Sequence, residues 1–128
     1  MQLQELLADV DVIDVCGDPS VDVRALAHDS RRVEPGACFA CIVGANDDGH
    51  DHAPEALRSG AVALLVERHL ERAVPEARVA SVRRALGPAA AQLHGHPSRA
   101  LRCLGVTGTN GKTTTTHLLA GIAGAAGE

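Results

Sequence analysis

Aromatic side chains are almost absent from this chain of 128 residues, which has one Phe and neither Trp nor Tyr. Hydrophobic residues still make up 45% of the sequence, so the core has to be built from Ala, Val, Leu and Ile. The sequence also lacks an apolar run approaching the roughly 18 residues that a membrane-spanning helix needs. Its N-terminus, Met-Gln-Leu-Gln-Glu, lacks the basic and then apolar order of a secretory signal. We therefore expect a cytoplasmic protein that has no membrane partner.

Positive charge is scarce as well. The chain has 12 basic and 16 acidic residues and a formal net charge of −4, which argues against a broad nucleic-acid-binding surface. We therefore expect no nucleic-acid partner. All of the basic residues except one are Arg, and the single Lys, Lys112, lies in a glycine-rich segment.

The four cysteines are Cys16, Cys38, Cys41 and Cys103, and in the cytoplasm their thiols would stay reduced. Cys38 and Cys41 have the Cys-x-x-Cys spacing of some zinc and redox sites. However, the surrounding run, residues 37–43, is typical of a strand, in which positions i and i+3 face opposite sides. We favour buried apolar cysteines over a metal or redox site.

The most informative segment is Thr-Gly-Thr-Asn-Gly-Lys-Thr at residues 107–113. An apolar run precedes it and a helix-like run follows it, which is the order of a phosphate-binding loop. Glycines let backbone amides approach phosphate oxygens, and the start of the helix adds free N–H groups and the positive end of its dipole. Lys112 would add a charge near the β- and γ-phosphates, and the Thr113 hydroxyl would supply a ligand for Mg²⁺. The predicted ATP-binding residues are Thr107, Gly108, Thr109, Asn110, Gly111, Lys112 and Thr113.

This segment departs from the strict pattern Gly-x4-Gly-Lys-Thr, because Val106 stands where the first Gly is expected. The alternative is a turn rich in Gly and Thr that happens to contain a Lys. The order of strand, turn and helix favours the phosphate-binding loop.

Strand and helix patterns alternate along the chain, which predicts an α/β fold with a largely parallel sheet. We expect strands at residues 10–15, 21–27, 37–43, 61–66, 78–82 and 101–106, and helices at residues 3–8, 51–59, 82–94 and 114–123. Asp51 and Ser81 are expected to cap the second and third helices, and Gly60 to end the second. The alternation within residues 21–27 places four apolar side chains on one face, namely Val21, Val23, Ala25 and Ala27.

Residues 95–98, Gly-His-Pro-Ser, break this pattern, and we expect a domain junction there. The part that follows is too short for a phosphate-loop domain, which needs several more strands and an acidic Mg²⁺ ligand on one of them. Its helix carries Leu118, Leu119 and Ile122 with little to pack against. We therefore expect the sequence to be the front of a longer polypeptide, with poor packing after Ala100.

Taken together, these segments resemble the Mur ligases, which build the peptide of bacterial cell-wall precursors. The loop from Gly105 to Thr116 is similar to the ATP loop of that family. Asp29-Ser30-Arg31, Pro35-Gly36 and Asp48-Gly49-His50-Asp51 resemble its N-terminal domain, and His96-Pro97-Ser98 resembles its junction. Order and spacing are most similar to the MurE branch, which adds the third amino acid. The resemblance covers nearly the whole chain.

The resemblance implies an α/β UDP-muramyl-binding domain at residues 1–98. Residues 99–128 would be the first strand, phosphate loop and helix of a truncated ATPase domain. The implied activity is an ATP-dependent ligation to UDP-MurNAc-L-Ala-D-Glu through an acyl-phosphate, with Mg²⁺ as a cofactor. Lys112 would be the catalytic residue, stabilising charge on the β- and γ-phosphates. Since the rest of the ligase is missing, we expect the 128-residue chain alone to be inactive.

Five residues correspond by position to the part of the family that binds the UDP end of the substrate: Ser30, His28, Ala45, Asn46 and Asp47. Ser30 matches a serine that contacts the UDP-sugar, and the position of His28 is one at which the family uses a main-chain contact. A simple turn residue remains the alternative for Ser30. Asp47 and Asp48 are more typical of loop solvation or capping than of ligands. Arg31 is more typical of a solvated surface, as is its neighbour Arg32.

Two other functions stay open at this point. A free-standing module that binds a nucleotide sugar would not need the Lys112-Thr113 pair. Another ligase with a related loop, MurF-like or similar to folylpolyglutamate synthase, would differ in the sequence of the loop or in the domain before it.

Overall fold

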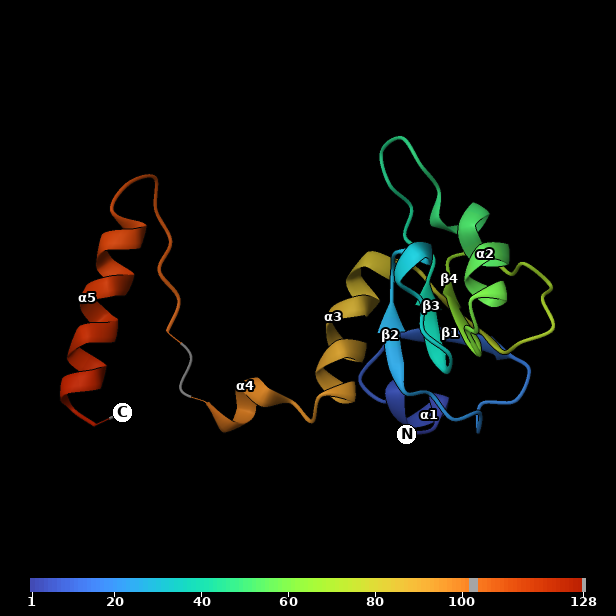
Figure 1. Ribbon diagram of the computed structural model, residues 1–128, viewed down its shortest axis with the longest axis horizontal. Helices are drawn as coiled ribbons and strands as arrows, with labels where there is room; N and C mark the ends of the chain where they lie inside the picture. The colour runs from blue at the N-terminus through green and yellow to red at the C-terminus, as the bar shows by residue number, and fades with distance from the viewer. Residues whose placement is uncertain (102–103, 128) are drawn as a thin grey trace. The chain divides into compact units, whose positions relative to one another are not determined.

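The computed structural model describes residues 1–101 and 104–127 of the chain. These form two compact units, Met1–Pro97 and Ser98–Glu128, and each is described by itself (Figure 1). Among the described residues, every helix is too short or too polar to span a lipid bilayer.

The first unit is built on a five-stranded sheet with the strand order β1-β5-β4-β3-β2. Neighbouring strands from β2 to β5 pair in parallel, and β1 pairs with β5 antiparallel at the edge. The prediction of an α/β fold with a largely parallel sheet is therefore confirmed. The strands are β1 (Val12–Cys16), β2 (Ala25–Ala27), β3 (Ala37–Ala40), β4 (Ala63–Val66) and β5 (Glu76–Val79).

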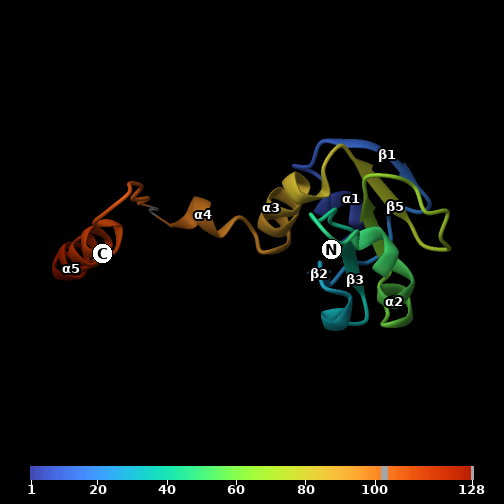
Figure 2. The ribbon, with the colours of Figure 1, turned by 90° about the horizontal axis from the view of Figure 1, so that it is seen from above.

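Every residue of β3 and β4 is buried, as expected for strands that are covered on both faces. One face packs against α1 (Leu3–Leu6) and α3 (Val82–Leu93), and the other packs against α2 (Ala53–Arg58) (Figure 2). The two faces therefore have separate apolar clusters, both made almost entirely of aliphatic side chains.

Cys38 and Cys41 are buried, Cys38 in the cluster under α1 and α3 and Cys41 in the cluster under α2. The prediction that their thiols face opposite sides is confirmed. Burial raises the pKa of each thiol to about 12, so both are apolar and unreactive at neutral pH. Cys16 is exposed at the end of β1, and Cys103 lies outside the described residues.

Of the two predicted helix caps, Asp51 is wrong, whereas Ser81 is at the predicted N-cap position but its side chain makes no capping hydrogen bond. Asp48, not Asp51, caps the turn before α2: its carboxylate accepts the amide of His50, and a 3₁₀ turn, η2 (Gly49–His52), leads into α2. Asp48 has the capping role because the helical turn already begins at Gly49.

Ser81 does precede α3, but the first amide of that helix, Val82 N–H, donates to Glu67 Oε1 at 2.9 Å. In the described part of the chain the cap of α3 is thus a carboxylate from beyond the end of β4. Gly60, with φ of +100°, ends α2 as predicted, because this conformation disfavours a side chain.

The predicted single face for residues 21–27 is also wrong. Val21 and Val23 pack into the cluster under α1 and α3, whereas Ala27 packs into the cluster under α2. Only Ala25–Ala27 pairs as a strand, so the two-residue period does not continue through the irregular backbone before it.

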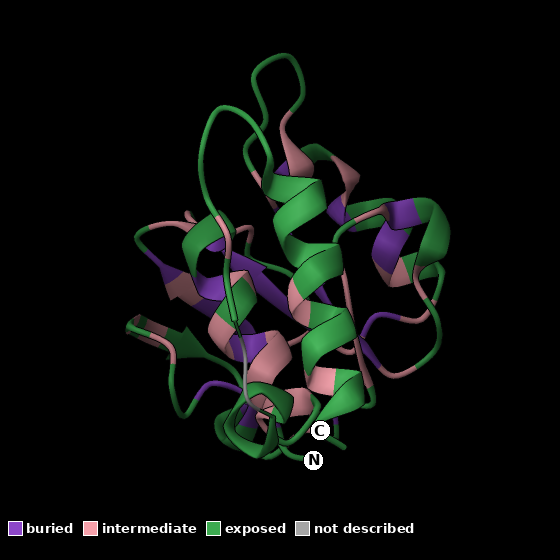
Figure 3. Cartoon of the chain, turned by 90° about the vertical axis from the view of Figure 1, so that its left-hand side faces the viewer, coloured by how far each residue is buried: buried purple, intermediate pink, exposed green. Residues whose placement is uncertain are grey.

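In the second unit, the regular elements of the described residues are the helices α4 (Pro97–Ala100) and α5 (Lys112–Ala125). A strand was predicted at residues 101–106, but Leu101, Leu104, Gly105 and Val106, its described part, are not in a strand. A strand needs a hydrogen-bonded neighbour, and the described residues of this unit offer only helices. Figure 3 shows that α5 is almost entirely exposed. The exposed fractions of Leu118 and Ile122 are 64% and 67%.

Candidate functional site

The glycine-rich loop leads directly into α5. Gly111 stands at the helix N-cap with φ of +76°, a left-handed conformation that Gly adopts readily, and Lys112 is the first helical residue. The Lys112 ammonium donates to the carbonyl oxygen of Gly108 at 2.5 Å, so it lies over the loop. The side chains from Thr107 to Thr113 are exposed.

This geometry suits an anion. The first amides of a helix as long as α5 have no carbonyl partner within the helix, and its dipole adds positive potential at the same end. The only lysine side chain in the sequence lies there too. A triphosphate therefore fits the residues present. The Thr113 hydroxyl could supply one oxygen to Mg²⁺, and the described residues contain no cluster of three or more His, Cys, Asp or Glu side chains arranged around a metal.

A pocket opens in the first unit where β2, the 3₁₀ turn η1 (Ser30–Arg32), β3 and α2 meet. It brings together three of the five residues expected to bind the UDP end, which are His28, Ser30 and Asp47. The other two, Ala45 and Asn46, are exposed on the same loop as Asp47 and are not among the residues that line the pocket. Its lining residues are His28, Asp29, Ser30, Arg31, Phe39, Asp47, His52 and Glu55.

Ser30 is buried, and its hydroxyl donates to Glu55 Oε2 at 2.6 Å. The hydroxyl proton is therefore committed to the carboxylate, and the lone pairs of the oxygen are left to accept a donor from a ligand. This contact differs from the alternative expected for Ser30, a turn residue that bonds its own backbone.

Asp29 and Arg31 form a two-point ion pair on the rim of the pocket. Arg31 Nε and Nη2 donate to the two oxygens of Asp29 at 2.9 and 2.8 Å, and the Arg31 amide donates to the same carboxylate. The hydrogen bonds from Arg31 hold the pKa of Asp29 at about 2, so it is ionised at neutral pH.

Among the other lining residues, His52 Nε2 lies 2.8 Å from Asp47 Oδ2. The hydrogen bond to Asp47 raises the pKa of His52 above its ordinary value. The rim therefore carries both a carboxylate and an imidazole that could contact a polar ligand.

Glu55, His52 and Phe39 line the pocket but were not predicted. Glu55 and His52 are three positions apart, a spacing that brings two side chains onto one face when a chain coils, and this was the available signal. A second cavity, beside the N-terminus of α3, contains none of the predicted site residues.

Comparison with known proteins was made at the level of families, sequences and solved structures. The profile of the Mur ligase family, catalytic domain, matches residues 22–100. The UDP-N-acetylmuramoyl-L-alanyl-D-glutamate–2,6-diaminopimelate ligase of Geobacillus thermodenitrificans is 44% identical over 128 residues, which is 100% of this chain and 26% of that protein. The ligase of the same name from Halalkalibacterium halodurans is 48% identical over 103 residues, 80% of this chain and 21% of its own length. The chain thus spans about a quarter of the length of these relatives.

Solved structures give the same result. The UDP-N-acetylmuramoylalanyl-D-glutamyl-2,6-diaminopimelate–D-alanyl-D-alanyl ligase from Acinetobacter baumannii matches 96% of this chain and 28% of its own, with a TM-score of 0.76 and 26% identity. A UDP-N-acetylmuramoyl-L-alanyl-D-glutamate–2,6-diaminopimelate ligase matches 100% of this chain and 26% of its own, with a TM-score of 0.75 and 27% identity. The MurF ligase of Thermotoga maritima, solved in complex with ADP, matches 73% of this chain and 21% of its own, with a TM-score of 0.57 and 35% identity.

Proposed function

Because the chain belongs to the Mur ligase family, we propose that it is the N-terminal part of an ATP-dependent ligase that extends UDP-MurNAc-L-Ala-D-Glu by one amino acid. Residues 1–98 bind the UDP end of this substrate, and residues 99–128 begin the ATP-binding domain. The observation that carries the proposal is the pocket that joins His28 and Ser30 with Asp47, which comes from a separate loop later in the chain. The amino acid to test first is 2,6-diaminopimelate, because it appears in the names of the Geobacillus thermodenitrificans and Halalkalibacterium halodurans ligases.

In such a reaction ATP, with Mg²⁺, supplies the phosphoryl group that activates the substrate carboxylate. The residues of this chain bind and orient. Lys112 and the first amides of α5 neutralise charge on the β- and γ-phosphates, which is the main way in which phosphoryl transfer is accelerated. The Thr113 hydroxyl would supply one oxygen ligand to Mg²⁺. The ADP in the Thermotoga maritima structure supports nucleotide use in the family.

In the pocket, Ser30 accepts a hydrogen bond from the UDP end, and Glu55 keeps the hydroxyl proton away from it. The 43–48 loop closes one side of the pocket with Asp47, and Ala45 and Asn46 extend along the same ligand. These roles hold the substrate; they add nothing to the chemical step, which takes place at the other end of the substrate.

A MurF-like ligase is the second candidate, since the Acinetobacter baumannii enzyme that adds D-alanyl-D-alanine has a TM-score of 0.76 to this chain. Sequence favours the first candidate, because the curated relatives at 44% and 48% identity both bear the name of the 2,6-diaminopimelate ligase.

The test is a chimera in which this chain replaces the matching quarter of the Geobacillus thermodenitrificans ligase. We expect it to form amide product from UDP-MurNAc-L-Ala-D-Glu, ATP and 2,6-diaminopimelate. Lys112→Met should lower kcat by about 100-fold or more, the typical loss when one charge-stabilising group is removed. His117→Ala, a change on the exposed surface of α5, is the matched control and should leave kcat unchanged.

The 128-residue chain alone should bind the UDP-muramyl dipeptide in calorimetry and form no product. A wild-type chain that does not bind this ligand, or a Lys112→Met chimera with full turnover, would refute the proposal. Product formed by the chain alone would refute the expectation that it is inactive.

A further inference from the structure

We propose that His50 is a positioning residue that fixes the 43–48 loop, and with it Asp47, at the rim of the pocket. The ligand of the pocket is taken from the proposed function, whereas the positioning role is argued from the contacts of His50 alone. His50 does not line the pocket, and its side chain has no exposed surface.

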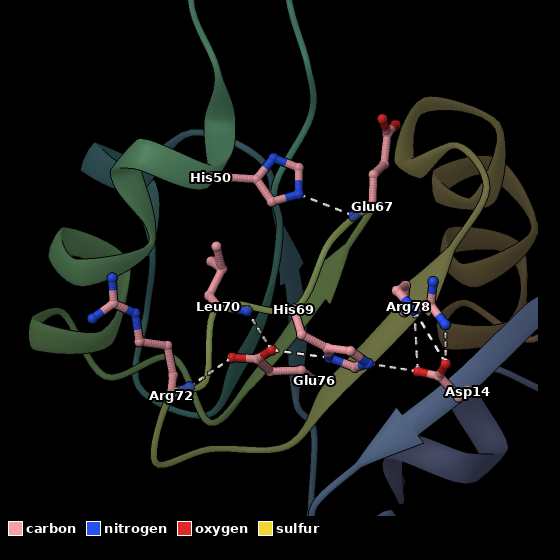
Figure 4. A network of polar contacts seen from close by, with 8 residues as sticks. All are labelled: Asp14, His50, Glu67, His69, Leu70, Arg72, Glu76 and Arg78. Carbon is pink, nitrogen blue, oxygen red and sulfur yellow. Dashed lines mark hydrogen bonds and ion pairs between the residues drawn. The ribbon is translucent and has the colours of Figure 1, made fainter.

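The ring of His50 uses both of its nitrogens. Glu67 N–H donates to Nε2 at 2.9 Å, so that nitrogen carries a lone pair and the ring proton must be on Nδ1 (Figure 4). Nδ1 then donates to Asp48 Oδ1 at 2.6 Å. A buried imidazole is unfavourable unless both nitrogens have partners, and here each partner belongs to a different segment of the chain.

Asp48 closes the 43–48 loop. The carbonyl oxygen of its neighbour Asp47 accepts a hydrogen bond from Gly44 N–H at 2.8 Å, and Val43 forms an antiparallel β-bridge with Asp48. The Asp48 carboxylate also accepts the His50 amide at 3.0 Å and the Arg68 guanidinium at 2.8 Å. Ala45, Asn46 and Asp47 are exposed, so apart from the hydrogen bond between Asp47 and His52 the contacts that position the loop lie at its base.

The other end of the connection is the start of α3. The backbone amide of Glu67 donates to His50. The side-chain carboxylate of Glu67 accepts a hydrogen bond from Val82 N–H, with 2.9 Å between the nitrogen and Oε1. A continuous path of hydrogen bonds therefore runs from the loop through the imidazole to the first turn of α3. A Leu at position 50 would fill the same space but would connect neither segment, which is why we assign positioning and not packing to His50.

Two substitutions separate the two bonds. His50→Gln places an amide oxygen near the position of Nε2, keeping the acceptor for Glu67 N–H and losing the link to Asp48. His50→Asn places an amide N–H near the position of Nδ1, keeping the link to Asp48 and losing the one to Glu67. His69→Gln is the matched control, because it removes a histidine with two hydrogen-bond partners that lies outside the pocket.

The affinity of each 128-residue variant for UDP is measured by calorimetry, well below its melting temperature. We expect the Kd to rise about tenfold in His50→Gln, because a loop that is no longer fixed must be ordered when the ligand binds, and to rise less in His50→Asn. His69→Gln should lower the melting temperature and leave the Kd unchanged. A folded His50→Gln variant with the wild-type Kd would overturn the proposal, since a merely structural role predicts that result.

A second readout does not depend on any ligand. Amide hydrogen exchange at Gly44 and Gly49, both hydrogen-bonded at the loop, should accelerate in His50→Gln, while Leu64 in the sheet should keep its wild-type rate. If the wild-type chain does not bind UDP, the proposed function fails, and exchange alone decides whether His50 fixes the loop. Unchanged exchange at Gly44 would then overturn the inference.

Discussion

Ser30 shows how a single hydrogen bond decides what a side chain can offer a ligand. Its hydroxyl donates to Glu55 at 2.6 Å, so the oxygen can only accept from the pocket. A donor such as an N–H or a hydroxyl of the substrate is therefore the matching group. The residue is buried at the base of the site, where an unmatched polar group on the ligand would be unfavourable.

We predict that Ser30→Ala weakens binding of the UDP-muramyl dipeptide by about tenfold, the cost of one lost hydrogen bond to a buried partner. Isothermal calorimetry on the 128-residue chain checks this. Ser20→Ala is the control, because Ser20 is exposed. Its hydroxyl donates to its near neighbour Asp18. Equal affinities of wild type and Ser30→Ala would contradict the role of Ser30.

At the scale of residues, the sequence predicts best where the relevant neighbours are local. The position of Lys112 at the start of a helix, directly after a glycine turn, could be predicted because these residues are adjacent in the chain, while its role in phosphate binding stays a prediction. His50 could not be assigned, because a histidine among Asp and Gly is typical of a solvated loop. Its burial depends on Glu67, 17 residues away, and no local pattern contains that information.

At the scale of elements, the edge strand β1 is held to β5 by charge as well as by the ladder. Asp14 on β1 accepts from Arg78 on β5 and from His69 Nε2 at 2.6 Å (Figure 4). The other ring nitrogen of His69 lies 3.1 Å from Glu76, which is buried in β5. A doubly protonated imidazole can donate to both carboxylates at once.

This geometry makes the stability of the first unit depend on pH. The hydrogen bond to Asp14, and then the one to Glu76, raises the pKa of His69 above its ordinary value of 6.5. Its contribution is therefore complete below pH 6.5 and is lost as the pH rises through the higher pKa of the folded state. The guanidinium of Arg78 lowers the pKa of Asp14, so the contribution of that carboxylate is lost only in acid.

We predict that the melting temperature of wild type exceeds that of His69→Gln by more at pH 5.5 than at pH 8.5. Differential scanning calorimetry at both pH values measures the two gaps. His117→Gln, in the second unit, is the control and should show no gap that depends on pH. A gap for His69→Gln that stays constant or widens toward pH 8.5 would show that His69 does not act as a cation here.

The strands buried on both faces could be predicted from continuous apolar runs, and the edge strand β1 from the alternation at residues 10–15. Residues 37–43 and 61–66 are continuous apolar runs, and β3 and β4 lie within them. Predictions were less accurate where tertiary contacts decide. Val21 and Ala27 alternate in the sequence but lie in different clusters, and the N-terminus of α3 is capped by Glu67 from another segment.

At the scale of the molecule, the two apolar clusters and the pocket lie entirely within the first unit. All of the clustered residues fall between Leu3 and Leu93, so this unit has a core of its own, as an independently folding domain requires. The second unit instead exposes large apolar side chains, which are Leu101, Leu104, Leu118 and Ile122. Such surfaces are typical of interaction sites.

We therefore predict that a chain of residues 1–97 keeps both the melting temperature and the UDP affinity of the 128-residue chain. It should also bind less of a dye that reports exposed apolar surface, because the four side chains of the second unit are removed with it. Calorimetry and dye fluorescence on the two purified chains check this. A decrease of the melting temperature by about 4–8 °C would mean that residues 98–128 stabilise the first unit by about 1 kcal/mol. That result would contradict the independence of the first unit, and a weaker UDP affinity would place part of the site outside it.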